Sequence, residues 1–469
     1  MPPAGSLRDS ARRIAPLAWP VFVGQISVVA FSTVDTLLVA RRDALDLAAL
    51  AVGSAAYITV FIGLMGVVLA LGPIVGQLFG AKQLPEAGAQ LHQAVWLALV
   101  LAAAGSLLLV FPAPFLALAR AAPEVEWRVR GYLGALAFAL PAALLFSAYR
   151  GFNVAVSRPK AVMALQVAGL ALKLPLSAAL VGGIDAIGLP AFGLRGCGIA
   201  TAGAMWAQVA VALVVLRRDP FYAAFELRAA GRRGLRAPDR RALAMQLRLG
   251  APMGLSILIE VTSFAWMALF ISRLGSTPAA GHQIAANLVS LLFMMPLGIA
   301  NACSTLVAQR VGARDLADAR RLGWHGIVIG LVVAAVMGGA VLFGREAVVH
   351  VYTRNPAVVA AALPLLAWVA LFHTADAAQA VAAFVLRGYR IATVPMLIFA
   401  GALWGVGLGG GYLLAFNVLG GTPAALQGAP GYWAAATAGN VVAALAMAAF
   451  LARVLRRQRA ISAAPAAPA

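Results

Sequence analysis

The sequence has little charge and almost no cysteine. Only 11% of its 469 residues are Asp, Glu, Lys or Arg, whereas 62% are hydrophobic, and the mean hydropathy is +0.91. A soluble domain carries roughly 25% charged residues, so the composition excludes an ordinary soluble protein. It also excludes a disordered chain, which needs many charges and few apolar residues. Two cysteines, Cys197 and Cys303, exclude a disulfide scaffold or a Cys-rich metal site.

Motifs of soluble catalytic sites are also missing. The sequence contains no GxxxxGK[ST] loop, so ATP is not the expected energy source. It contains no HExxH motif, and no pair of acids at the spacing with which membrane prenyltransferases hold magnesium. We therefore expect a protein that is not an enzyme and that needs no cofactor.

Long apolar stretches are what the sequence has instead. A helix that crosses a bilayer needs about 20 largely apolar residues. The Gly- and Pro-rich segment Gly420–Gly431 divides the last and longest stretch into two. The pattern thus predicts an all-α integral membrane protein with twelve transmembrane helices, in stretches at 14–40, 47–81, 93–119, 131–149, 161–184, 196–216, 249–272, 274–309, 322–344, 355–386 and, divided, 391–452.

Basic residues predict the orientation of these helices. If both termini lie in the cytoplasm, 26 of the 36 Lys and Arg also lie on the cytoplasmic side and nine lie outside, as the positive-inside rule requires. The opposite orientation violates that rule. The net charge of +20 therefore indicates topology rather than a nucleic-acid partner, and its most basic loop could also contact anionic membrane lipids.

The two halves of the sequence repeat each other. Leu17, Pro20, Gly66 and Gln77 recur at a constant offset as Leu249, Pro252, Gly298 and Gln309. After a five-residue adjustment of that offset, Arg150-Gly151 recurs as Arg387-Gly388. An even number of helices per half predicts two six-helix lobes related by a pseudo-twofold axis along the membrane normal. We expect an N-lobe at 1–216, a basic cytoplasmic linker at 217–245, a C-lobe at 246–459 and a disordered tail at 460–469.

Three acidic residues lie deep within predicted helices. They are Asp35, Glu260 and Asp376, and each costs roughly 2.5–3.5 kcal/mol at mid-bilayer. Their counterparts in the repeat are uncharged: Met267, Val28 and Ala139. Because the repeated fold does not need an acid at these positions, binding of a proton or cation is the favoured interpretation. The alternative is a neutral structural acid that is hydrogen-bonded between helices.

A few other polar residues interrupt the predicted helices. Lys173 is the single basic residue within a span; it could pair with a carboxylate, contact a substrate or extend its amine toward the membrane surface. Gln25, Gln283 and Asn287 could line a cleft between the lobes, and hydrogen bonds between helices are the alternative.

Several blocks of sequence resemble the multidrug and toxic compound extrusion (MATE) family, in its NorM-like branch. They occur in the expected order across nearly all of the chain, and their number, together with the repeat, makes the resemblance specific. The blocks are WPVFVGQISVVAFSTVDTLLVAR, LGPIVGQLFGA, LRGCGIATA, APMGLSILIEVTSFAWMALF, GHQIAANLVSLLFMMPLGIA and HTADAAQAVAAFVLRGYRIATVPM.

The resemblance implies secondary active efflux, in which cationic amphipathic drugs leave the cell by alternating access as Na⁺ or H⁺ enters. It places Glu260 and Asp376 on the family's cation site, which would hold Na⁺ in a sodium-coupled member. Asp35 falls on an acid implicated in proton or substrate binding. Gln283 and Phe293 fall near the cation site, and Phe293 stands where some sodium-coupled members have tyrosine.

The resemblance further implies a multi-pass protein of the bacterial inner membrane, with drugs, coupling ion and lipids as its partners, and the enclosed plan suits a monomer. The choice between Na⁺ and H⁺ stays open. The alternative function is a flippase for lipid-linked oligosaccharide or polysaccharide, from the same superfamily. Such a protein would carry a basic cavity for anionic head groups, whereas here the intramembrane acids outnumber Lys173.

Overall fold

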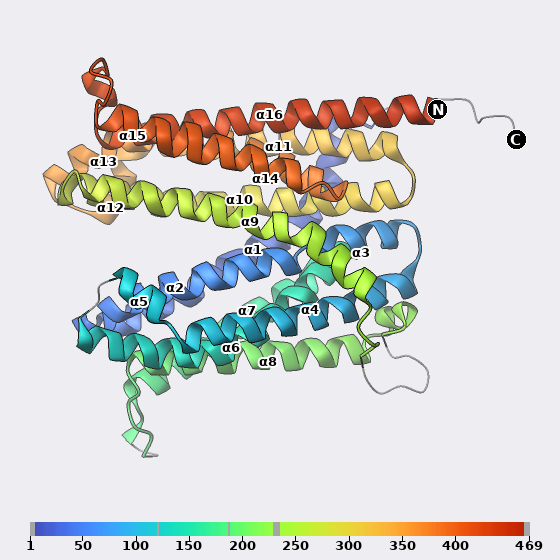
Figure 1. Ribbon diagram of the computed structural model, residues 1–469, viewed down its shortest axis with the longest axis horizontal. Coiled ribbons are helices and arrows are strands. Elements are labelled where there is room, and N and C mark those ends of the chain that lie inside the picture. The colour runs from blue at the N-terminus through green and yellow to red at the C-terminus, as the bar shows by residue number, and fades with distance from the viewer. Residues whose placement is uncertain (1–4, 120–121, 186–187, 228–234, 464–469) are drawn as a thin grey trace, which may run out of the picture. The chain divides into compact units, whose positions relative to one another are not determined.

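A computed structural model describes residues 5–119, 122–185, 188–227 and 235–463 (Figure 1). Within these residues the chain is helical, and its only β-type pairing is an isolated bridge between Ile184 and Leu189. Twelve helical segments are long and apolar enough to cross a membrane. The predicted all-α architecture with twelve transmembrane helices is thereby confirmed.

The chain divides into two compact units. We call Pro20–Leu255 the N-terminal unit; the C-terminal unit comprises the described residues up to Trp19 together with those from Ser256 onward. Two helices therefore belong in part to each unit: α1 (Leu7–Ala40) and α9 (Arg240–Ser272). The boundaries of the predicted lobes lay between predicted helices, whereas the boundaries of these two units lie within helices.

The N-terminal unit holds the greater part of α1 and the first half of α9. Between them lie α2 (Ala44–Val68), α3 (Leu71–Gly80), α4 (Leu84–Val110), α5 (Ala113–Ala119), α6 (Pro123–Ala155), α7 (Pro159–Gly182), α8 (Leu194–Arg218) and the 3₁₀ helix η2 (Pro220–Phe225).

The C-terminal unit continues from α9. It contains α10 (Ser276–Gly312), α11 (Leu316–Phe343), α12 (Arg345–Tyr352), α13 (Pro356–Gly388), α14 (Thr393–Phe399), the π-helical segment η3 (Ala400–Gly409), α15 (Gly410–Ala415), the 3₁₀ turn η4 (Ala424–Leu426) and α16 (Ala429–Ala463).

One helix forms the centre of each unit. In the N-terminal unit α6 packs against α2, α4 and α8, and in the C-terminal unit α13 packs against α10, α11 and α16. The neighbours of α6 are the second, third and sixth membrane-spanning segments of the chain, and those of α13 are the eighth, ninth and twelfth. Each neighbour in one unit thus has a counterpart six segments away in the other, which is the pattern that the sequence repeat predicts. Each central helix ends close to its Arg-Gly pair, Arg150-Gly151 in α6 and Arg387-Gly388 in α13.

Several helix boundaries differ from the sequence prediction. The stretch predicted at 93–119 is divided, because α4 ends at Val110 and the short segment with Pro112 separates it from α5; proline cannot donate the hydrogen bond that would continue a helix. The stretch at 47–81 breaks between α2 and α3. The long final stretch divides as predicted, since α15 ends at Ala415 and α16 begins at Ala429.

The predicted linker and tail both include helical residues. Within 217–245, the side chains of Tyr222 and Phe225 in η2 are buried, and residues 228–234 lie outside the described part of the chain. Gln93 and Trp96 of α4 donate hydrogen bonds to the carbonyl oxygens of Ala237 and Arg236. α16 continues to Ala463, and the remainder of the predicted tail, 464–469, lies outside the described residues.

Candidate functional site

Two of the predicted acids lie in the C-terminal unit and close to one another. Asp376, on the central helix α13, is buried, and its Oδ1 accepts hydrogen bonds from Gln379 Nε2 at 2.9 Å and Asn440 Nδ2 at 3.4 Å. Glu260, on α9, is half-buried and lies within electrostatic range of both Asp376 and Arg387. Two carboxylates within their helices thus lie close together, and Glu260 is also near the guanidinium of Arg387 at the end of α13.

The π-helical segment η3 contacts the backbone on either side of Glu260. Trp404 Nε1 donates to the carbonyl oxygen of Ile259 at 3.1 Å, and Ser263 Oγ donates to that of Leu403 at 3.3 Å. The N–H of Gly410, which follows η3, reaches back five residues to Gly405 O. Short π-helical insertions are frequent at functional sites, and here one packs beside the acid-bearing turn of α9.

Further polar atoms on α13 are buried near Asp376. His373 and Gln379 lie three residues before and after it, hence on the same face of the helix. Both ring nitrogens of His373 and the Oε1 atom of Gln379 are buried, and none has a hydrogen-bond partner among the described residues. Buried polar atoms of this kind are usually paired, so this face of α13 could accept a further partner, as could the Oδ1 atom of Asp35, which also has none among the described residues.

The third predicted acid has a different environment in the N-terminal unit. Asp35 of α1 accepts a hydrogen bond from Lys173 Nζ of α7 on its Oδ2 atom, at 2.7 Å. The same ammonium group donates to Thr201 Oγ1 of α8 at 2.8 Å and to the carbonyl oxygen of Phe31 at 3.1 Å. Of the alternatives for Lys173, pairing with a carboxylate is therefore the one that the structure adopts.

Gln25 has a cationic partner in the N-terminal unit. Its Oε1 accepts a hydrogen bond from Arg150 Nη1 at 3.0 Å, and Arg150 Nη2 lies 3.3 Å from the sulfur of Met65. Arg150, the arginine of the Arg-Gly pair in α6, thus contacts α1, the first helix of its unit. The equivalent Arg387 of α13 is likewise close to α9, through Glu260.

The remaining predicted residues lie on α10. Gln283 and Asn287 are exposed one turn apart, and Phe293 is half-buried. Asn287 Oδ1 accepts a hydrogen bond from the hydroxyl of Tyr352 at 2.9 Å. Within the described residues, no hydrogen bond joins Gln283 or Asn287 to Glu260 or Asp376.

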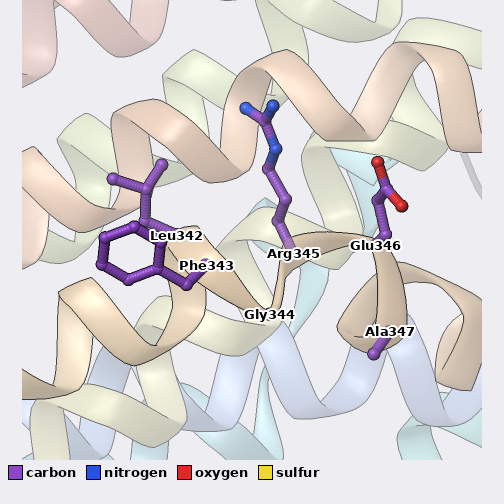
Figure 2. Close-up of a pocket in the computed structure, with 6 residues that line it drawn as sticks. All are labelled: Leu342, Phe343, Gly344, Arg345, Glu346 and Ala347. Atoms are coloured by element: carbon purple, nitrogen blue, oxygen red, sulfur yellow. The ribbon is translucent and has the colours of Figure 1, made fainter.

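A separate cavity of about 630 Å³ lies where α11 meets α12. Figure 2 shows its lining, in which the side chains of Arg345 and Glu346 extend to the same side of the chain. None of the three intramembrane acids lines it. The described part of the chain also holds no cluster of three or more His, Cys, Asp or Glu side chains that could bind a metal ion.

Sequence reasoning missed several residues of these sites. Gln379 could have been found, because its spacing from Asp376 places both on one helical face. Arg387 carries the repeated Arg-Gly signal. Asn440 and Thr201 are contributed by helices remote in the sequence, and no local pattern relates them to Asp376 or Lys173.

The sequence profile of the MatE family matches twice, over residues 20–179 and 252–413. The chain belongs to the MatE family. The two matches fall one in each half of the chain, as the internal repeat predicts, and the resemblance read from the sequence is confirmed. Membership of the MatE family, with twelve apolar helices, makes the chain a multi-pass membrane transporter and not an enzyme.

Individual members of the MatE family align over nearly the whole chain. A probable multidrug resistance protein NorM of Aromatoleum aromaticum is 41% identical over 450 residues, which cover 95% of each chain. A second protein of that name, from Chromobacterium violaceum, is 36% identical over 96% of this chain and 95% of its own. The crystal structure of the Vibrio cholerae MATE transporter VcmN in the bent form matches with a TM-score of 0.83 at 18% identity, covering 96% of this chain and 98% of that one.

Proposed function

We propose that this protein exports amphipathic cationic compounds from the cell in exchange for entering Na⁺ or H⁺. The observation that carries the proposal is the pair of carboxylates in the C-terminal unit, Glu260 and Asp376, whose charges interact within a membrane-spanning region. Intramembrane carboxylates are costly and typically mark ion or substrate pathways. The names of the relatives, multidrug resistance proteins, support drugs as the cargo.

The chemistry of the site suits exchange of a monovalent cation. A cation held by Glu260 and Asp376 offsets the repulsion between the two charges, and the amide of Gln379 supplies a further oxygen ligand beside them. Binding of the ion lowers the affinity for a cationic drug, because both are attracted by the same negative charge. Each ligand shifts the alternation between inward- and outward-facing states only through its different affinity for them.

The other predicted residues are assigned to the substrate. Gln283, Asn287 and Phe293 of α10 and Gln25 of α1 would contact the drug through amide and aromatic groups. Asp35 is already paired with Lys173, so we assign the exchange of ions to the C-terminal unit. The protein would work as a monomer in a bacterial inner membrane, with both termini in the cytoplasm.

Transport into proteoliposomes tests this function. The probe is ethidium, a fluorescent cation, and sodium and pH gradients are imposed separately on vesicles that contain purified protein. We expect one gradient to drive ethidium transport in the wild type, and Asp376→Asn to abolish transport by that gradient.

The control is Glu346→Gln, which removes an exposed carboxylate from α12 and should leave transport unchanged. If Asp376→Asn transported ethidium at the wild-type rate, the C-terminal site would not be the ion site. Failure of both gradients to drive any ethidium transport in the wild type would count against cation efflux and favour the flippase.

A further inference from the structure

Lys173 occupies a complete binding site for an ammonium group. Its side chain is only 1% exposed, and an ammonium group has three N–H donors and no acceptor. The three oxygen partners come from α1 and α8: the carboxylate of Asp35, the carbonyl oxygen of Phe31 and the hydroxyl of Thr201. The nitrogen also lies 4.8 Å from the centre of the Phe31 ring, within the range of a cation–π contact. No N–H of this ammonium is left without a partner.

The charges around Asp35 balance locally. Cys197 and Tyr132 are the other titratable side chains beside Asp35, and thiol and phenol groups are ordinarily uncharged near neutral pH. The carboxylate and the ammonium therefore form a neutral pair. In the C-terminal unit, by contrast, the charge of Arg387 acts on Glu260, and within the described residues no salt bridge joins Asp376 to a basic side chain, so the two carboxylates leave one negative charge in excess when both are ionised.

We propose that Lys173 is a tethered, permanent counter-ion that occupies the place where the Asp35 carboxylate would otherwise take up a cation from solution. This inference rests on the proposed function and makes it narrower: ions exchange only at Glu260 and Asp376, and the N-terminal unit contributes none to the cycle. An external Na⁺ or H⁺ reaches Asp35 only by leaving the Lys173 ammonium buried and unpaired, which is a strongly unfavourable state.

Removal of the ammonium should therefore create a second ion site. In Lys173→Met the side chain keeps its length and loses its charge, so Asp35 must take up a proton or Na⁺ to be neutral. The number of ions exchanged per ethidium should rise by one relative to the wild type. Asp35→Asn/Lys173→Met removes both charges together and should return the number to the wild-type value, whereas Lys173→Arg keeps a cation in place.

The stoichiometry is measured as the equilibrium accumulation of ethidium in proteoliposomes against the size of the imposed ion gradient. The slope of the logarithmic plot gives ions per ethidium. A steeper slope in Lys173→Met, restored in the double variant, is the expected result. Equal slopes for the wild type and Lys173→Met would overturn the proposal.

A second measurement does not depend on transport. Dicyclohexylcarbodiimide modifies protonated carboxyl groups in apolar surroundings, and mass spectrometry locates the adduct. In the wild type we expect adducts at Glu260 or Asp376 and none at Asp35; in Lys173→Met, Asp35 should also be modified. Modification of Asp35 in the wild type would refute the tethered counter-ion even if Lys173→Met failed to fold. Failure of every gradient to drive wild-type transport, with Asp35 unmodified, would instead reject the proposed antiport alone.

Discussion

At the scale of single residues, the partner of each buried carboxylate decides whether it is available to a mobile ion. Asp35 has an ammonium partner at 2.7 Å. Asp376 has two amide donors, which hydrogen-bond to the carboxylate without neutralising it. The difference between the two units is therefore chemical, although both carboxylates lie in apolar helices, and one lysine accounts for it.

A pH effect is expected from Asp219, which lies in the loop between α8 and η2. Its Oδ1 accepts the Phe221 N–H at 2.9 Å and its Oδ2 pairs with Arg158; both contacts hold the pKa of the carboxyl below its usual value. A carboxyl with a lowered pKa stabilises the fold above the unfolded pKa, near pH 4, and loses this contribution as the pH falls through the lower folded value. Asp219→Asn should lower the melting temperature in detergent at pH 7.

The melting-temperature difference between the Asp219→Asn variant and the wild type should narrow as the pH falls below about 4. Glu124→Gln, which changes an exposed acid at the start of α6, should melt like the wild type throughout. A difference that stays constant down to pH 3 would mean that Asp219 stabilises the loop by packing and not by its charge.

At the scale of helices, the hydropathy of the sequence predicted how many transmembrane helices there are, but not the hydrogen-bond pattern within each helix. Twelve membrane crossings follow from apolar length, because a helix satisfies its own backbone hydrogen bonds and needs about 20 apolar residues to cross a bilayer. The π-helical form of η3 could not be predicted, since helix propensities do not distinguish one helical hydrogen-bond register from another. For the same reason the contact of Trp404 with the carbonyl before Glu260 was not foreseen, while the mid-helix position of Glu260 was.

Packing of α16 on η3 predicts a strong effect at Gly439. A Cβ atom at this position would lie 2.7 Å from the carbonyl oxygen of Ala402 and 3.2 Å from the nitrogen of Gly407, both backbone atoms that cannot rotate away. Gly439→Ala should therefore destabilise the protein by about 1–3 kcal/mol, as overpacking typically does, and lower the melting temperature in detergent. Gly405→Ala on η3 is the control, because its Cβ would meet no described atom within 4 Å. A wild-type melting temperature for Gly439→Ala would show that the two segments can separate at no cost.

At the scale of the whole molecule, the two helices that bear Asp35 and Glu260 are also the two that pass from one unit to the other. α1 changes unit between Trp19 and Pro20, and α9 does so between Leu255 and Ser256. Each of these helices contains one of the repeated prolines, Pro20 or Pro252, which removes a backbone hydrogen bond and favours bending. Each acid thus has a covalent connection, through its own helix, to the unit that does not contain it.

The orientation in the membrane is the last prediction at this scale, and the buried cysteines make it simple to test. Cys197 and Cys303 are both fully buried, so their replacement by Ala gives a background without accessible thiols. Single cysteines are then placed at two exposed positions, Glu346→Cys on α12 and Ala313→Cys after α10. If the N-terminus is cytoplasmic, residue 313 follows eight membrane crossings and lies inside. Residue 346 follows nine crossings and lies outside.

A membrane-impermeant maleimide should therefore label Glu346→Cys in intact spheroplasts and Ala313→Cys only after permeabilisation. Ethidium transport by the background without the two native cysteines serves as the control for correct folding. The reverse labelling pattern would place the termini outside, together with most of the basic residues, against the charge rule on which the orientation rests. It would also reverse the direction of the proposed exchange, because the same alternation of states would then carry the drug inward.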